Sequence, residues 1–354
     1  MRESDEWTGK NVQSWNIVEL LLLLFGQVLF NTRTQFQKNP LESLINLDVA
    51  QNSLQESRFK FKTCPKRRAV LQMERIWSPA IEDQLEFRVH GGVKEQAPDE
   101  VQLSKKLIEY LRLDVALDPL YKLWAKNDEH FKKVVGNENF KGVRILKQNP
   151  RENVFSFICS SNNNISRISS MVENLCKFYG DKICQVEGQD YYSFPKVERL
   201  AQPGVESKLR ANGFGYRAPF IQKSAQKIVA NGGEEWLFSL TKMDYPEAKQ
   251  ELITLPGIGA KVADCICLMS LGHLQAVPVD THVFQIAANW YLPHLKKNKT
   301  VTGKVYDEIT GHYQKLYGPL AGWAHTVLFC ADLKMFQETK ATNSKKAVKR
   351  KAKK

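Results

Sequence analysis

Cysteine is scarce in this sequence and is not arranged to bind a metal. The 354 residues include seven cysteines, an odd number spread along the chain. Small secreted proteins held together by disulfides have a far higher density, so a reducing, intracellular compartment is predicted. The one close pair, Cys265 and Cys267, forms only a Cys-x-Cys. The sequence therefore predicts no metal centre.

The sequence also lacks an apolar run long enough to cross a membrane. The most apolar stretch, Ile17 to Phe25, extends at most over Trp15 to Phe30 and includes Glu19. A membrane helix needs about 20 apolar residues, so this stretch is too short. Three acidic residues among the first six also argue against a signal peptide. A buried strand or pair of strands is the preferred interpretation.

The overall composition is that of a globular protein with an excess of positive charge. Hydrophobic residues make up 43% and charged residues 25%, and the length suggests two or three domains. The formal net charge is +13, and the last fourteen residues carry seven bases and no acid, which leaves +6 for the body. A basic body with a basic tail favours a polyanionic partner, nucleic acid before an anionic membrane.

The pattern of hydrophobic residues changes near residue 100. Before it, β-like runs occur at 20–24, 28–30, 76–77 and 85–90, whereas the stretch 31–68 has no clear pattern. After it, helical spacing predominates. Helices are predicted around 103–111, 120–124, 131–135, 150–159 and 165–179. The chain is thus predicted to be α+β, mostly helical, with a low-complexity basic tail after about residue 338.

A turn with two glycines lies between two amphipathic segments. The sequence Leu255-Pro-Gly-Ile-Gly259 ends one of them, and the next begins at Ala260, with apolar residues on one face. Gly257 and Gly259 permit a tight turn whose backbone N–H groups lie beside a helix start, which suits a phosphate oxygen. Most turns of this kind simply connect helices, so the turn alone leaves both interpretations open.

Two chemically active side chains flank this region. Lys261 lies in the first turn of the second helix, where the helix dipole opposes positive charge and favours a neutral, nucleophilic amine. Asp280 follows nineteen residues later in Val-Pro-Val-Asp-Thr-His and is predicted to be the N-cap of the next helix. A cap alone would explain the aspartate. A lysine and a carboxylate that begin adjacent helices are, however, able to face one site.

Several motifs together resemble a known family. LPGIGAKVADCICLM followed by AVPVDTH resembles the helix-hairpin-helix Gly/Pro-Asp superfamily of DNA glycosylases. FSFICSSNNNISRI and GFGYRA narrow the resemblance to the eukaryotic 8-oxoguanine DNA glycosylase/AP lyase, over roughly residues 100–335. The resemblance implies an N-terminal antiparallel-sheet α/β domain (1–100), a helical glycosylase domain (101–338) with its hairpin at about 246–271, and a disordered basic tail (339–354).

The resemblance also implies a reaction. The enzyme flips a damaged nucleotide out of the duplex, and Lys261 attacks the sugar C1′ and displaces the base. Asp280 stabilises the cationic transition state and helps the amine lose its proton. The resulting imine allows β-elimination, which nicks the strand 3′ to the lesion.

Further residues match the lesion pocket of the family. Cys265 and Phe329 match the pair that sandwiches the oxidised purine, and Pro278 belongs to the same pocket; plain core packing would also explain them. Where the family has a glutamine that reads the base, this chain has His325, which lacks the paired hydrogen bonds of an amide. The glycine that recognises the lesion corresponds best to Gly26, in a segment without the family's Arg-Trp, and residues 31–69 align poorly.

Other residues match the family's contacts with the opposite strand and the backbone. Asn162, Arg167 and Arg217 correspond to residues that hold the orphaned cytosine, and Tyr216 to the neighbouring wedge. The asparagine run alternatively forms a helix cap and turn. His282 matches a residue near the lesion phosphate, or is simply a histidine at a helix start.

The expected partner is therefore damaged double-stranded DNA, with a monomeric, nuclear protein, no membrane association and no iron–sulfur cluster; a mitochondrial form is left open. A third class, the iron–sulfur glycosylases that act on oxidised pyrimidines or mispaired adenine, is disfavoured, because their four-cysteine cluster follows the helix of the aspartate and here only Cys330 lies beyond the Asp280 helix. The alternative function is a catalytically impaired DNA-binding relative whose altered N-terminus no longer recognises the lesion.

Overall fold

The structure is a computed structural model that describes residues 70–78, 81–90, 100–136, 140, 142–186, 188–298 and 300–332. The strands predicted at 20–24 and 28–30, Gly26 and the basic tail lie outside these residues. In the described part of the chain, no helix is both long and apolar enough to span a membrane.

Helices dominate the described residues. The strands are β1 (Val70–Ser78), β2 (Ile81–His90), β3 (Lys182–Val186) and β4 (Gln189–Tyr192). The helices before the hairpin are α4 (Glu100–Leu111), α5 (Leu117–Asn127), α6 (Glu129–Val135), α7 (Pro150–Ser160), α8 (Ile165–Tyr179), α9 (Val197–Leu200), α10 (Val205–Ala211), α11 (Arg217–Ala230), α12 (Glu234–Ser239) and η2 (Leu240–Lys242). From the hairpin onwards they are α13 (Tyr245–Ile253), α14 (Ala260–Ile266), η3 (Cys267–Leu271), α15 (Thr281–Ile286), η4 (Ala287–Tyr291), η5 (Pro293–Lys297), α16 (Gly303–Tyr317), η6 (Gly318–Leu320) and α17 (Ala321–Asp332).

The helical body packs around α7 and α17, which are buried on nearly every face. Residues 153–160 of α7 and 321–330 of α17 are all buried. A helix that is apolar all round must lie inside a protein, because no side of it gains from contact with water. Trp323 in α17 donates its Nε1–H to the carbonyl of Val143 at 2.7 Å, so the extended link between α6 and α7 is fastened to this core.

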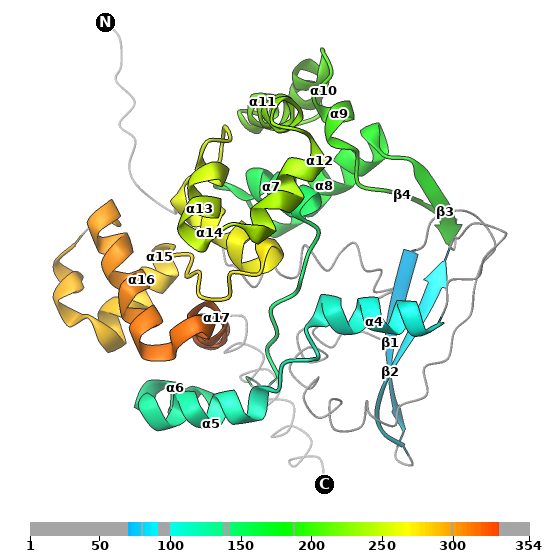
Figure 1. The fold of residues 1–354 in the computed structure, drawn as a ribbon. Coiled ribbons are helices and arrows are strands. Elements are labelled where there is room, and N and C mark those ends of the chain that lie inside the picture. The colour runs from blue at the N-terminus through cyan, green and yellow to red at the C-terminus, as the bar shows by residue number, and fades with distance from the viewer. Residues whose placement is uncertain are drawn as a thin grey trace, which may run out of the picture.

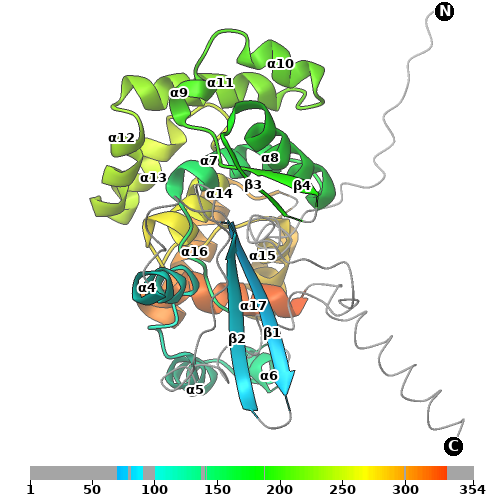
Figure 2. The ribbon, with the colours of Figure 1, turned by 90° about the vertical axis from the view of Figure 1, so that its right-hand side faces the viewer.

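The helices at the two ends of the molecule are separated by the hairpin helices α13 and α14 (Figures 1 and 2). Helices α9, α10 and α11 lie at one end, α5 and α6 lie at the other, and α7 and α14 lie in the middle (Figures 1 and 2). The β1–β2 pair is an antiparallel ribbon in the half of the molecule that contains α4 (Figure 1). Its register pairs Val70 with His90 and shifts between Ile76 and Ser78.

The local patterns correctly predicted helices at the places of α4 to α8. The interruption between α7 and α8 falls where the polar cluster was expected, because Asn164 in that cluster caps the start of α8, as Asn149 caps the start of α7. Their side chains accept the backbone N–H groups of Arg151 and Arg167 at 3.0 and 2.8 Å. The short β3–β4 hairpin was missed, although Gly188 at φ +83° supplies a turn signal between its strands.

The mostly helical fold is confirmed, while the N-terminal sheet domain is not. Within the described residues, the part before residue 100 contains the two-stranded β1–β2 ribbon and no larger sheet. The division at residues 100 and 338 stays a prediction.

Candidate active site

The predicted helix-hairpin-helix forms from α13, a turn at residues 254–259, and α14. Helix α11 supports the turn: Ser224 Oγ donates to the carbonyl of Pro256 at 2.8 Å, and Lys227 Nζ donates to that of Thr254 at 2.9 Å. Gly257 has φ +87°, and a Cβ on it would lie 2.8 Å from the Phe220 ring. Both the backbone conformation and the close approach of Phe220 therefore require glycine at this position.

Lys261 and Asp280 occupy the helix positions that the sequence predicted. Lys261 is the second residue of α14 and is half-buried. Asp280 is the N-cap of α15, where its Oδ1 accepts the backbone N–H of Val283 at 2.8 Å. Its other oxygen, Oδ2, is buried and has no hydrogen-bond partner among the described residues. One carboxylate oxygen is thus fixed by the helix, and the other remains available to a reacting group.

Lys261, Asp280 and Cys265 interact electrostatically. Burial raises the pKa of the Asp280 carboxyl, and the positive charge of Lys261 opposes that rise. Burial also raises the pKa of the Cys265 thiol to about 12, although Lys261 lies within hydrogen-bonding reach of it. The cysteine is therefore a neutral thiol at physiological pH. Because a neutral thiol is a poor nucleophile, Lys261 remains the predicted nucleophile of this cluster.

A second group of predicted residues adjoins the first at the start of α15. His282 meets the Phe329 ring edge-on, with centroids 6.1 Å apart, and its Nδ1 lies 3.9 Å from Asp332 Oδ2. The charge of His282 also acts on Asp280. The Phe329 ring also packs against the His325 ring in a tilted arrangement, with the ring centroids 6.1 Å apart. Cys265, Phe329 and His325 are all buried, as is Pro278, so the roles predicted for them in a base pocket require this region to open.

The residues predicted to read the opposite base also lie together. Arg217 Nη2 donates to the backbone carbonyls of Ser161 and Asn162, the latter at 2.9 Å. The Arg217 guanidinium lies 4.4 Å from the centre of the Tyr216 ring, and the Tyr216 hydroxyl donates to Ser161 at 2.7 Å. Arg167 Nη2 donates to the carbonyl of Gly213 at 2.8 Å. These contacts join the turn after α7 to the turn before α11.

In this arrangement the Nη2 group of Arg217 is occupied by the protein's own backbone, whereas its Nε is buried without a hydrogen-bond partner among the described residues. Its side chain is 2% exposed, whereas Tyr216 is 46% exposed, and Asn162 has a left-handed φ of +46°. The Ser161 and Asn162 carbonyls are acceptors, as are the O2 and N3 atoms of cytosine. A cytosine bound by Nη2 would have to take the place of these two carbonyls.

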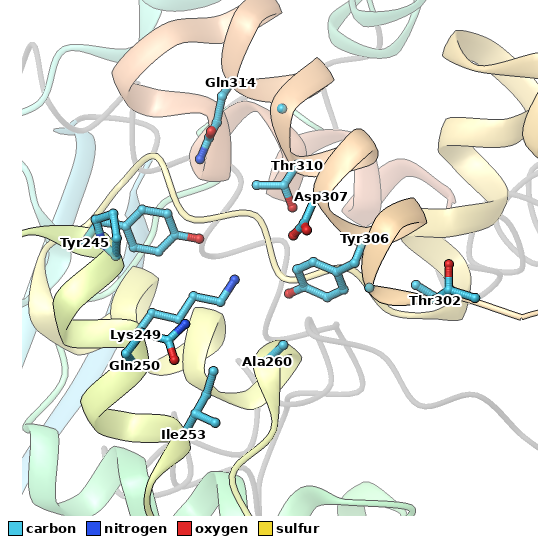
Figure 3. A pocket seen from close by; sticks show the side chains of 14 residues that line it. Tyr245, Lys249, Gln250, Ile253, Ala260, Thr302, Tyr306, Asp307, Thr310 and Gln314 are labelled. Carbon is cyan, nitrogen blue, oxygen red and sulfur yellow. The ribbon is translucent and has the colours of Figure 1, made fainter.

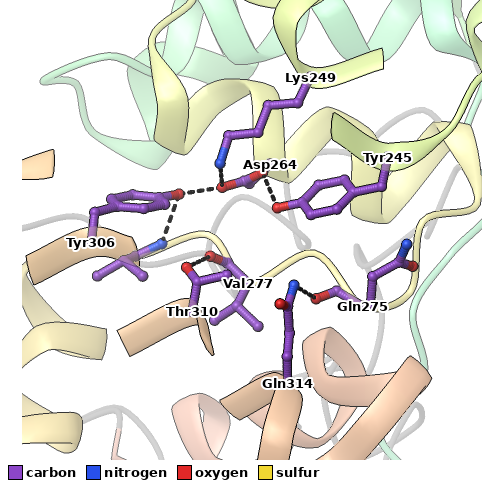
Figure 4. A network of polar contacts seen from close by, with 9 residues as sticks. Tyr245, Lys249, Asp264, Gln275, Val277, Tyr306, Thr310 and Gln314 are labelled. Carbon is purple, nitrogen blue, oxygen red and sulfur yellow. Dashed lines mark hydrogen bonds and ion pairs between the residues drawn. The ribbon is translucent and has the colours of Figure 1, made fainter. Parts of the chain in front are cut away.

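The sequence patterns did not predict the role of one buried acidic residue near the site, Asp264. Asp264 lies between Lys261 and Cys267 on α14, is fully buried, and binds side chains of α13 and α16 (Figure 4). The available signal was an acidic residue inside an otherwise apolar run, which normally requires a partner.

His325 is a buried histidine from which we expect the stability of the protein to be sensitive to acid. It is 1% exposed, and burial lowers its pKa to about 4. Neither ring nitrogen has a hydrogen-bond partner in the described part of the chain. The unfolded chain takes up a proton near pH 6.5 and the folded protein does not, so stability should fall between pH 6.5 and 4, by about 3 kcal/mol.

We expect His325→Gln to abolish this loss. Urea unfolding at pH 7 and pH 4.5 would measure it, with His294→Gln as the control because His294 is exposed and hydrogen-bonds Glu308 at 2.7 Å. Equal acid sensitivity in wild type and the His325→Gln variant would contradict the assignment.

Two protein families match this chain and define the class of protein to which it belongs. Residues 155–309, which contain the hairpin, Lys261 and Asp280, match the HhH-GPD superfamily of base excision DNA repair proteins. Residues 36–154 match the N-terminal domain of 8-oxoguanine DNA glycosylases. The expectation that residues 31–69 do not align is therefore wrong for most of that stretch, while Gly26 lies before the match begins.

The relatives define the family. The chain is 39% identical to the N-glycosylase/DNA lyase OGG1 of Arabidopsis thaliana over 71% of this chain and 67% of that protein. It is also 39% identical to the N-glycosylase/DNA lyase of Saccharomyces cerevisiae, over 65% and 67% of the two chains. The chain belongs to the 8-oxoguanine DNA glycosylase/DNA lyase family.

Solved structures agree with this assignment. The chain superimposes with a TM-score of 0.59 and 26% identity on the Clostridium acetobutylicum 8-oxoguanine glycosylase/lyase in complex with double-stranded DNA that has cytosine opposite 8-oxoguanine. The match covers 75% of this chain and 87% of the bacterial protein. Among the described residues, no three His, Cys, Asp or Glu side chains are grouped so that they could hold a metal ion.

Proposed function

We propose that this protein excises 8-oxoguanine opposite cytosine from duplex DNA and then cleaves the strand through a Schiff base on Lys261. The observation that carries the proposal is the cluster of Lys261 and Asp280 at the starts of α14 and α15, in which one buried oxygen of Asp280 has no hydrogen-bond partner within the described residues. Family membership and the bacterial complex with 8-oxoguanine opposite cytosine support the choice of substrate.

The chemistry follows from an amine beside a carboxylate. The neutral amine of Lys261 attacks C1′ of the flipped nucleotide, the glycosidic bond breaks, and the base leaves with its bonding electrons and takes up a proton. The negative charge of Asp280 stabilises the positive charge that develops on the sugar. Loss of the amine proton and opening of the sugar ring give an imine. A proton then leaves C2′ and the bond to the 3′ phosphate breaks.

Binding would use the hairpin and the turns near Arg217. The first N–H groups of a helix have no partner within the helix, so the turn that ends at Gly259 offers donors to a DNA phosphate. The net charge of +13 favours the same partner. We further propose that the protein acts as a monomer in the nucleus, where its Lys-rich C-terminus would serve as an address and a nonspecific DNA contact.

Borohydride trapping on a duplex with one 8-oxoguanine·cytosine pair tests the proposal. Reduction of the imine should leave protein and DNA covalently joined, and an undamaged duplex should give no adduct. Tight binding without base release or trapping would instead support the catalytically impaired relative.

Arg217→Ala should narrow the preference for the opposite base. Cytosine presents O2 and N3 as acceptors to a guanidinium, whereas adenine presents only N1 on that edge. Paired contacts of this kind are worth about 1–3 kcal/mol, so we expect excision opposite cytosine to be about ten- to a hundredfold faster than opposite adenine, and the variant to lose most of this difference. Single-turnover excision on the two duplexes measures it. Equal wild-type rates would refute the reading of cytosine.

A further inference from the structure

Asp264 is a buried carboxylate that connects the hairpin to α16. It lies on α14, one turn after Lys261, and its side chain is fully buried. Its Oδ1 accepts the Tyr245 hydroxyl at 2.7 Å, and its Oδ2 accepts Lys249 Nζ at 2.8 Å and the Tyr306 hydroxyl (Figure 4). Burial raises the pKa of Asp264, and the charge of Lys249 opposes that rise. Three donors thus hold the α14 helix from two neighbouring helices.

Tyr306 extends this connection to the residue before Asp280. Its hydroxyl donates to Asp264 and accepts the backbone N–H of Val279 at 3.2 Å. A single phenol oxygen therefore bridges the helix that carries Lys261 and the segment that ends in Asp280. In the described part of the chain, no other side chain forms hydrogen bonds with both.

The same face of α16 follows the whole segment that leads to Asp280. Tyr306, Thr310 and Gln314 are spaced four apart and contact Val279 N, Val277 O and Gln275 O, at 3.2, 3.5 and 3.1 Å (Figure 4). Four residues of helix rise about 6 Å and two residues of extended chain about 6.6 Å, so the two repeats match. Helix α16 thus holds residues 275–279 by three hydrogen bonds from one of its faces.

We propose that Tyr306 is a positioning residue for the lysine chemistry, which it serves by fixing Asp280 relative to Lys261. The inference rests on the proposed function, since it assumes that these two groups react together. A misplacement of about 1 Å in a reacting pair can cost a hundredfold in rate. The cap bond to Val283 orients one oxygen of the Asp280 side chain, whereas the Tyr306 hydroxyl fixes the backbone of the residue directly before it, Val279.

The surroundings of Tyr306 make a clean substitution possible. Tyr245, Lys249 and Tyr306 line a cavity of about 590 Å³ between α13 and α16 (Figure 3). In Tyr306→Phe, water from this cavity is able to hydrogen-bond Asp264 and Val279 N–H, so the fold should persist. A mobile water does not hold the two backbones at a fixed separation as a side chain on a helix does.

Tyr245→Phe is the matched control. It also removes one phenol hydroxyl from Asp264, but Tyr245 forms no hydrogen bond to the 275–279 segment. Both variants should melt a few degrees below wild type, about 2–4 °C. We expect Tyr306→Phe to lower the single-turnover rate of 8-oxoguanine release by about ten- to a hundredfold and Tyr245→Phe by less than about threefold. The Kd for the duplex should change by less than about twofold in either variant, because neither hydroxyl belongs to the proposed DNA contacts.

The outcomes separate this inference from the proposed function. A wild type that neither releases 8-oxoguanine nor forms a trapped adduct refutes the proposed function. An active wild type with equal rate losses in the two variants, or with a wild-type rate in Tyr306→Phe, refutes the positioning role alone.

If Tyr306→Phe does not fold, Asp264→Asn provides the second test. With its amide oxygen toward Lys249 and Tyr306, asparagine offers a neutral acceptor in place of a charged one, which weakens both bonds, so the rate should fall at unchanged Kd. An unchanged rate in Asp264→Asn would refute the proposal.

Discussion

Lys261→Gln should abolish both 8-oxoguanine release and borohydride trapping. The amide of glutamine has no nucleophilic lone pair, while its length keeps the first turn of α14 filled. Loss of a covalent nucleophile typically lowers a rate by on the order of 10⁴-fold or more. Because the turn at residues 254–259 offers backbone donors, and α11 supports it through Ser224 and Lys227, duplex binding should remain close to wild type.

The measurements are single-turnover base release, trapping on the 8-oxoguanine·cytosine duplex, and Kd. Lys122→Gln on α5 is the matched control, since Lys122 is exposed and lies outside the hairpin. Trapping of the Lys261→Gln variant at the wild-type rate would show that another amine is the nucleophile. The buried Cys265 does not replace the lysine, because its thiol is neutral.

Asp280→Asn should separate the catalytic role of this residue from its structural role. Asparagine is as good an N-cap as aspartate, so its oxygen continues to accept the N–H of Val283 and α15 stays capped. The substitution removes the negative charge that faces the developing cation. Loss of one preorganised electrostatic contact typically costs about 10²–10³ in rate, and we expect a decrease of that size in base release.

The same variant should alter the pH dependence. Burial raises the pKa of Asp280 above its ordinary 3.8, so the wild-type rate should decrease, as the pH is lowered, at a higher pH than that value. The folded state binds this proton more tightly than the unfolded state does, so protonation of Asp280 adds to the free energy of unfolding at low pH. This contribution is lost as the pH rises from the ordinary pKa of 3.8 through the raised pKa of the folded protein. Asp280→Asn lacks both effects, which rate profiles and urea unfolding between pH 4 and 7 would measure.

Asp280→Ala is the comparison variant for this prediction. It removes the charge and the cap together, so it should show the same rate loss and in addition a loss of stability of about 1 kcal/mol. An Asp280→Asn protein with a wild-type rate would refute the electrostatic role.

Local sequence patterns predicted the parts of the site that depend on neighbouring residues. Helix starts favour a capping side chain, so two helix starts were predictable from Asp280 and Asn164. A tight turn favours glycine, so the turn of the hairpin was predictable from Gly257. The helical spacing likewise located α7 and α8, because the period of the apolar residues is a property of the helix itself.

The sequence did not predict contacts between side chains from distant segments. The donors to Asp264 come from α13 and α16, up to 42 residues away, and no short pattern connects Tyr306 with Val279. The β3–β4 hairpin was missed for a related reason, since strands of five and four residues are too short to establish a period.

The sequence by itself determined the family and the places of the two groups proposed to carry the chemistry, an amine at a helix start and a carboxylate at the next cap. Only the tertiary structure decided their surroundings. Among the described residues it leaves one oxygen of Asp280 buried without a hydrogen-bond partner and bonds Arg217 to the backbone of the turn after α7. It also places the Tyr306 hydroxyl between Asp264 and Val279. Burial and hydrogen-bond partners depend on how distant helices pack, and that packing follows from the whole core rather than from any one motif.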